Sequence, residues 1–114
     1  MSVQTTQLTQ VDVTTGTGTS TAGAATVNTQ TGVITTEALV TAAAATYTFT
    51  LTNSLINASS ILNVIVGKGT STTGGLVPVF CTPAAGSAVI LLQNVTAAPL
   101  NGTVKIYFSV LNIT

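Results

Sequence analysis

The stretch that decides the fold is "ATYTFTLTNS", residues 45–54. Alternate positions place Tyr47, Phe49 and Leu51 on one face of an extended chain, and threonines on the other face. This period-two pattern predicts a half-buried β-strand whose apolar face belongs to the core. The solvent face is unusual, because it carries only threonine where exposed strands of soluble proteins usually carry charged side chains.

Charge is scarce along the whole chain. Only 4% of the 114 residues are charged, against an average of about 25% in soluble domains. The charged residues are Asp12, Glu37, Lys68 and Lys105. Threonine fills much of this gap, and its β-branched side chain favours strands. The composition therefore predicts a single all-β domain with a largely neutral surface.

Short apolar segments separated by turn residues follow from residue 26 onward. Examples are "SILNVIVGKG", "AVILLQNVT" and "TVKIYFSVLNI". Their spacing predicts a small antiparallel β-sandwich. Asn28 and Gly32 favour a hairpin, and the pair Asn101-Gly102 favours a type I′ turn before the last strand. The alanine run at 42–45 is expected to be a connection between strands, with a helical turn as the alternative.

The chain divides into an N-terminal arm, residues 1–24, and a β-sandwich, residues 25–114. The arm ends in "TTGTGTSTAGAA", which has too little bulk to pack and suits a flexible linker. The predicted core of the sandwich comprises Tyr47, Phe49, Leu51, Val64 and Val66.

The last predicted strand, "TVKIYFSVLNI", carries large apolar side chains on both faces. A strand of this kind is expected to be central in its sheet or to lie at an interface between subunits. We therefore assign Ile106, Phe108, Val110 and Leu111 to a subunit interface.

The residues needed for catalysis or metal binding are missing from the sequence. There is no histidine, and the single cysteine, Cys81, has neither a disulfide partner nor a base to activate it, so a small buried hydrophobe is expected. Two isolated carboxylates make no metal site. We expect no enzyme activity and no cofactor.

Composition also argues against two classes of partner. Zero net charge provides no attraction to nucleic acid. No apolar run is long enough for a membrane helix, and "MSVQTTQLTQ" lacks the pattern of a secretory signal. Asn57, Asn94, Asn101 and Asn112 match the N-glycosylation pattern. About two such matches arise by chance in so Ser/Thr-rich a chain, and we attribute them to chance.

Two long segments carry a family resemblance. They are "TGVITTEALVTAAAATYTFTLTNSLINASSILNVIVG" and, after a Gly-rich loop, "VILLQNVTAAPLNGTVKIYFSVLNI". Residues 26–114 resemble the small β-sandwich modules in virion proteins of tailed bacteriophages, especially marine ones. Such modules occur as capsid decoration, head-fibre or tail-fibre domains. The resemblance implies a jelly-roll-like fold, a trimeric unit and no catalytic residues.

The leading expectation is a structural virion protein that forms a homotrimer on the capsid surface or fibre of a phage. Its N-terminal arm would bind the major capsid protein or another virion protein. One alternative is a glycan-binding sandwich in which Tyr47 and Tyr107 stack on sugars. The other alternative is a subunit of an extracellular filament or surface layer, joined to its neighbours by the arm.

Overall fold

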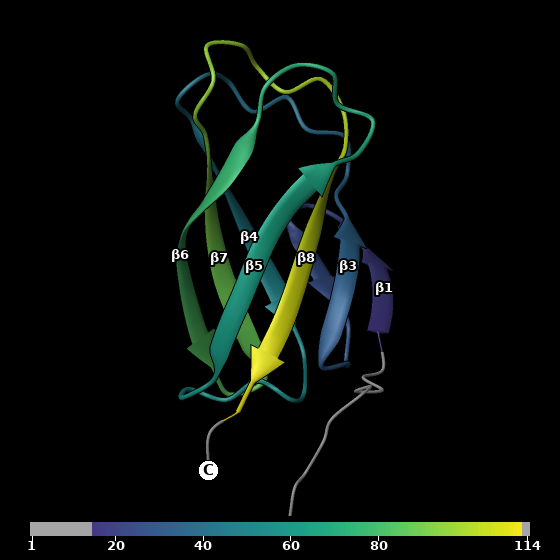
Figure 1. The fold of residues 1–114 in the computed structure, drawn as a ribbon, viewed down its shortest axis with the longest axis vertical. Helices are drawn as coiled ribbons and strands as arrows, with labels where there is room; N and C mark the ends of the chain where they lie inside the picture. The colour runs from purple at the N-terminus through teal and green to yellow at the C-terminus, as the bar shows by residue number, and fades with distance from the viewer. Residues whose placement is uncertain (1–14, 113–114) are drawn as a thin grey trace, which may run out of the picture.

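The computed structural model describes residues 15–112, in which eight strands form two packed sheets (Figure 1). The first sheet contains, in spatial order, β1 (Thr15–Thr19), β3 (Thr31–Thr35), β8 (Val104–Leu111) and β5 (Ile61–Lys68). The second contains β2 (Ala24–Thr26), β4 (Thr46–Thr52), β7 (Ser87–Asn94) and β6 (Leu76–Ala84). No helix occurs among the described residues. The predicted all-β sandwich is confirmed, and residues 42–45 are a connection between strands.

Successive strands alternate between the two sheets, and only β6 and β7 follow each other within one sheet. The strands from β3 to β8 pair antiparallel, with β3 and β4 beside β8 and β7, which is the paired winding of a jelly roll. The strands β1 and β2 add to β3 and β4 in parallel. They can do so because each connecting segment crosses to the opposite sheet before the chain returns.

The two turns predicted from Asn-Gly signals are wrong. The segment from Asn28 to Gly32 crosses between the sheets, because β2 and β3 belong to different sheets. The pair Asn101-Gly102 lies in a second crossover, and neither residue has the positive φ of a type I′ turn. The tight hairpin is Ala85-Gly86, between β6 and β7, where Gly86 has a φ of 80°.

The predicted arm boundary at residue 24 is also corrected. Strand β1 pairs with β3 from Thr15 to Thr19, so this part of the expected linker belongs to the first sheet. The glycines that suggested flexibility make room for a core side chain. A Cβ atom on Gly16 or Gly18 would lie 2.6 or 2.7 Å from a methyl carbon of Val27, which is buried. Residues 1–14 of the predicted arm lie outside the described residues.

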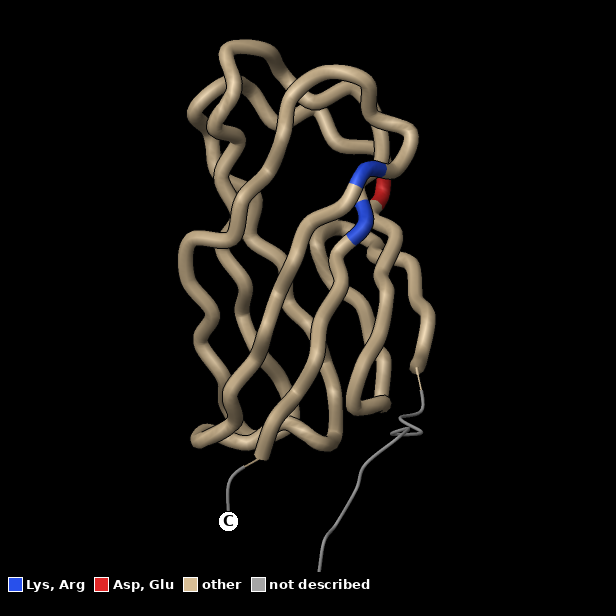
Figure 2. Tube along the Cα trace, in the orientation of Figure 1, with Lys and Arg blue, Asp and Glu red and all other residues tan. Residues whose placement is uncertain are grey.

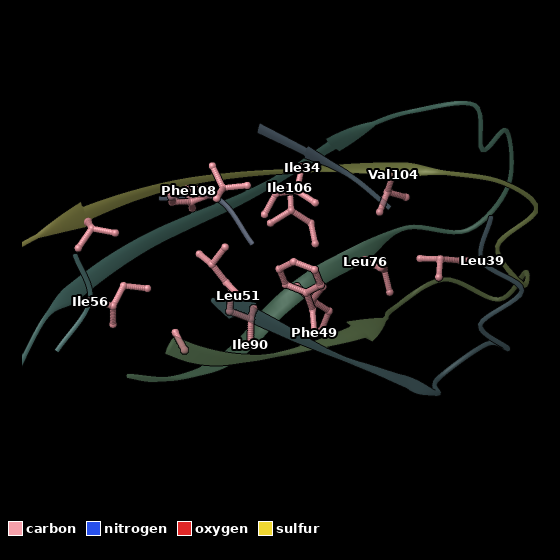
Figure 3. Close-up of a cluster of buried hydrophobic side chains, with 14 of the residues drawn as sticks. Ile34, Leu39, Phe49, Leu51, Ile56, Leu76, Ile90, Val104, Ile106 and Phe108 are labelled. Carbon is pink, nitrogen blue, oxygen red and sulfur yellow. The ribbon is translucent and has the colours of Figure 1, made fainter. Parts of the chain in front are cut away.

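The core lies between the sheets, where apolar side chains from both point toward one another (Figure 3). Phe49 and Leu51 of β4 are completely buried, as the period-two pattern predicts. Tyr47, Val64 and Val66 are partly buried and pack against this core. The threonines of β4 point away from it, exposed or half-buried.

A pair of substitutions on β4 tests this assignment of faces. Phe49→Ala removes a fully buried ring and is expected to lower the free energy of unfolding by about 3–5 kcal/mol. Thr48→Ser removes one methyl group from the exposed face and is expected to cost at most about 0.5 kcal/mol. Denaturant unfolding followed by circular dichroism measures both. If Thr48→Ser were more destabilising than Phe49→Ala, the assignment of buried and exposed faces would be wrong.

Candidate functional site

The predicted interface residues of β8 are placed mainly in the core, which corrects their assignment. Ile106, Phe108 and Val110 are buried between the sheets, so they cannot contact another subunit in the folded chain. Leu111 is 50% exposed and remains on the surface. The strand is central, between β3 and β5, which is the other position that its apolar faces predict.

The most exposed aromatic side chain lies on β6, in a position that alternation alone would have buried. Leu76 of this strand points into the core, so strict alternation would bury Phe80 as well. A β-bulge between Pro78 and Phe80 inserts one residue and reverses the alternation. Phe80 is consequently 67% exposed, and Cys81 packs against the core instead.

Phe80 belongs to an apolar area on the outer face of the second sheet. Its direct cross-strand neighbour is Leu91 of β7, which is half-buried. Val77 and Val89, further along the same two strands, are 40% and 42% exposed. We call these four residues the β6–β7 patch. The apolar signal was visible in "LVPVF" and "AVILL", but the bulge that exposes Phe80 has no signature in the sequence.

A second group of exposed apolar side chains lies on the outer face of the first sheet. Ile65 of β5 lies opposite Tyr107 of β8, and Ile61 lies opposite Leu111. The ring of Tyr107 covers Gly67, where a Cβ atom would come within 2.5 Å of the ring carbon Cε2. We call these residues, Ile61, Ile65, Tyr107 and Leu111, the β5–β8 face.

The few charges of the described chain gather at one level of the sandwich (Figure 2). Lys105 lies opposite Gly67, and Lys68 lies opposite Val104, so the two lysines sit at the same end of the β5–β8 pair. The remaining surface of the described chain is neutral. Neither apolar group contains a charged side chain.

Glu37 is the acidic residue within residues 15–112, and it holds the turn between β1 and β2 in place. Its carboxylate accepts hydrogen bonds from the Ser20 hydroxyl, from the Gly23 amide at 2.8 Å and from the Tyr47 hydroxyl at 2.9 Å. Gly23 and Ala22, with φ values of 78° and 51°, make a strained reversal that these bonds hold.

The same contacts set the ionisation of Glu37 and Tyr47. Burial raises the pKa of Glu37, but the hydrogen bonds to its carboxylate outweigh burial and hold the pKa below the ordinary value of 4.5. Burial, with the adjacent carboxylate, raises the pKa of Tyr47 to about 12. Its carboxylate is bonded to Ser20, Gly23 and Tyr47, so Glu37 acts as a structural residue.

Tyr47 and Tyr107, the expected sugar platforms, do not form a common site. Tyr47 is partly buried, and its hydroxyl is bonded to Glu37. Tyr107 lies on the outer face of the opposite sheet, over Gly67. No pocket occurs in the described part of the chain.

The glycosylation pattern meets different surroundings at its four positions. Asn94 is fully buried, and its Nδ2 donates to the carbonyl oxygens of Thr41 and Ala98 at 3.1 and 2.8 Å. This asparagine anchors loops and cannot accept a glycan in the folded chain. Asn101 is exposed, but its Oδ1 accepts the amides of residues 72 and 73 and so clamps the loop after β5. Asn57 and Asn112 are exposed.

Residues 15–112 contain one cysteine and one glutamate, and no histidine or aspartate. Cys81 is half-buried, and burial raises the pKa of its thiol. No group of three or more His, Cys, Asp or Glu side chains comes together among these residues. They also include no helix able to cross a bilayer.

Comparisons with models of protein families, with curated proteins and with solved structures found no match to this chain.

The Glu37 cluster predicts a specific acid sensitivity. Because the folded pKa lies below the unfolded value, the stabilisation is present above about pH 4.5 and is lost as the pH falls through the folded pKa. We expect Glu37→Gln to lower stability at pH 7 and to flatten the dependence of stability on pH below about 5. Thermal unfolding across this range measures the effect.

Asp12→Asn provides the control, since Asp12 is the only other acidic side chain. The role of the cluster would be contradicted if the loss of stability at acid pH were unchanged in Glu37→Gln but reduced in Asp12→Asn.

Proposed function

We propose that this chain is a structural virion protein, a self-associating subunit that decorates the capsid or forms part of a fibre of a bacteriophage. The observation that carries the proposal is the β6–β7 patch, an uncharged apolar area centred on Phe80. We propose a homotrimer as the assembled unit.

The surface chemistry of the sandwich supports self-association. Contiguous exposed apolar areas on soluble domains commonly mark contacts with other molecules. Copies of this chain carry almost no charge, so neighbours packed in a repetitive array experience little electrostatic repulsion. A small single core is also only marginally stable, and subunit contacts add to it by mass action.

Threonine hydroxyls give the exposed sheets a way to remain hydrated without charge. Thr15 of β1 and Thr31 of β3 lie directly opposite each other, and their hydroxyls are 2.9 Å apart. On β4, residues 46, 48 and 52 are exposed threonines. Such faces suit a subunit surrounded by identical neighbours, because hydroxyls can bond either water or another copy.

The location on a phage particle rests on the family resemblance of residues 26–114. The proposed attachment segment is residues 1–14, because the first sheet begins at Thr15 with β1. Its partner would be the major capsid protein or another virion protein. A subunit of an extracellular filament or surface layer is the second candidate, since the same surface features suit it. Mass spectrometry of purified particles separates the two, because only a virion protein is found in them.

The first test changes the patch. Phe80→Ser is expected to shift the assembly toward monomers in sedimentation experiments, because it removes the most exposed ring of the β6–β7 patch. Val40→Ser is the control, since Val40 is 83% exposed and lies outside the patch. We expect the control to sediment like the wild type. A wild-type chain that stays monomeric at micromolar concentration would contradict self-association.

The second test removes the segment proposed for attachment. Deleting residues 2–14 leaves β1 intact, so the sandwich is expected to fold and to unfold at nearly the same denaturant concentration. Binding to particles that lack the protein is expected to be lost. Unchanged binding of the truncated chain would refute the anchoring role.

A further inference from the structure

The four edges of the two sheets differ in how well they are protected. Strand β6 carries two prolines and a bulge, features that block the addition of another strand. Strands β1 and β2 have only five and three residues. Strand β5 has eight residues, contains no proline and shows no bulge in its pairing with β8. It is the unprotected edge of the sandwich.

The side chains of β5 match the pattern of an incomplete sheet. Its inward residues Leu62, Val64 and Val66 are only partly buried, whereas the corresponding residues of the central strand β8 are buried. On the outer face, Ile61 is 44% exposed and Ile65 is 66% exposed. A further strand beside β5 would cover both sets.

We propose that the free edge of β5 pairs with β5 of a second copy, antiparallel, about a twofold axis at Asn63. In this register Asn63 lies opposite Asn63 of the second copy, and Ile61 lies opposite its Ile65. The inward residues follow the same rule, with Leu62 opposite Val64. Apolar side chains thus meet apolar side chains, and each contact between two different residues occurs twice about the axis, as in any isologous contact.

The pairing also continues rows that already cross the first sheet. Leu111 lies opposite Ile61, and Tyr107 lies opposite Ile65. Across the proposed contact, Leu111 and Ile61 of one copy continue into Ile65 and Tyr107 of the second copy as one apolar row. The twofold axis generates a second, identical row. Between the two rows lies a polar row of serine and asparagine, because the Asn63 amide already lies 3.5 Å from the Ser109 hydroxyl.

Charge does not oppose the contact. The only charged residue of β5 is Lys68, and it lies beyond the paired segment 61–65. The two lysines of one copy therefore do not face those of the other. This contact rests on the proposed self-association and adds to it an interface separate from the β6–β7 patch, on the edge of the other sheet.

A cysteine placed on the twofold axis tests the register. In a Cys81→Ser background, Asn63→Cys would place two Cα atoms about 4.5–5.5 Å apart, within disulfide range. We expect mild oxidation to give a disulfide-linked dimer. Ser109→Cys in the same background is the control, because its copy would lie three strand spacings away, about 14 Å. Equal cross-linking of both variants, or none of Asn63→Cys, would overturn the register.

Hydrogen exchange of the unmodified protein tests the edge without a substitution. The amides of β5 are expected to gain protection as the concentration rises toward about 1 mM, since one short strand pair makes a small interface. The amides of β1, at the opposite edge of the sheet, provide the internal control. Unchanged exchange in β5 would overturn the proposed pairing.

A third measurement separates this inference from the proposed function. Ile65→Lys is expected to weaken the edge contact at least about tenfold, because it places a charge in the apolar row. Phe80→Ser is expected to leave the Asn63→Cys cross-link intact. If the wild type assembles but Asn63→Cys fails to cross-link, self-association stands and the β5 contact falls. If Asn63→Cys cross-links but the Phe80 substitution leaves sedimentation unchanged, the β5 contact stands and the role of the β6–β7 patch falls.

Discussion

The packing of one apolar sheet face against the other is the interaction on which the rest of the structure depends. Phe49, Leu51, Ile90 and Leu92 come from the second sheet, and Ile34 and Ile106 from the first, all completely buried. With almost no charged residues, the chain gains little from ion pairs, and this burial is its main source of stability. Each connection that crosses between the sheets must therefore keep them in register.

Buried polar side chains maintain that register. Asn94 at the end of β7 binds the loops near residues 41 and 98, while Asn53 after β4 donates to the carbonyl of Thr29 at 2.7 Å. Thr36 accepts the amide of Val104 at 3.0 Å and so joins the ends of β3 and β8. Among the described residues, no buried side-chain nitrogen or oxygen lacks a partner. Neutral amides and hydroxyls thus do the work that ion pairs do elsewhere, without the cost of burying charge.

Sequence reasoning succeeded where alternation was undisturbed. Strand β4 keeps a strict period of two, so its buried face could be predicted, and the apolar side chains on both faces of β8 allowed a central place for that strand. It failed where a residue acts through its spatial neighbours. In the sequence, Gly16 and Gly18 indicate a linker, but in the structure the Val27 side chain occupies the space that a Cβ atom on either glycine would need. The bulge that exposes Phe80, and the burial of Ile106 and Phe108 rather than their exposure, depend on long-range pairing that local patterns do not encode.

The central position of β8 has a consequence for how the chain folds as it is synthesised. Strands β3 and β5 of the first sheet do not pair with each other, and only the last strand, β8, joins them. A growing chain that ends before Val104 therefore holds two separated parts of a sheet and an uncovered core. Non-local pairing of this kind slows folding and leaves apolar strands open to other chains. We expect the sandwich to close only after synthesis of β8, so that folding and assembly compete for the same exposed strands.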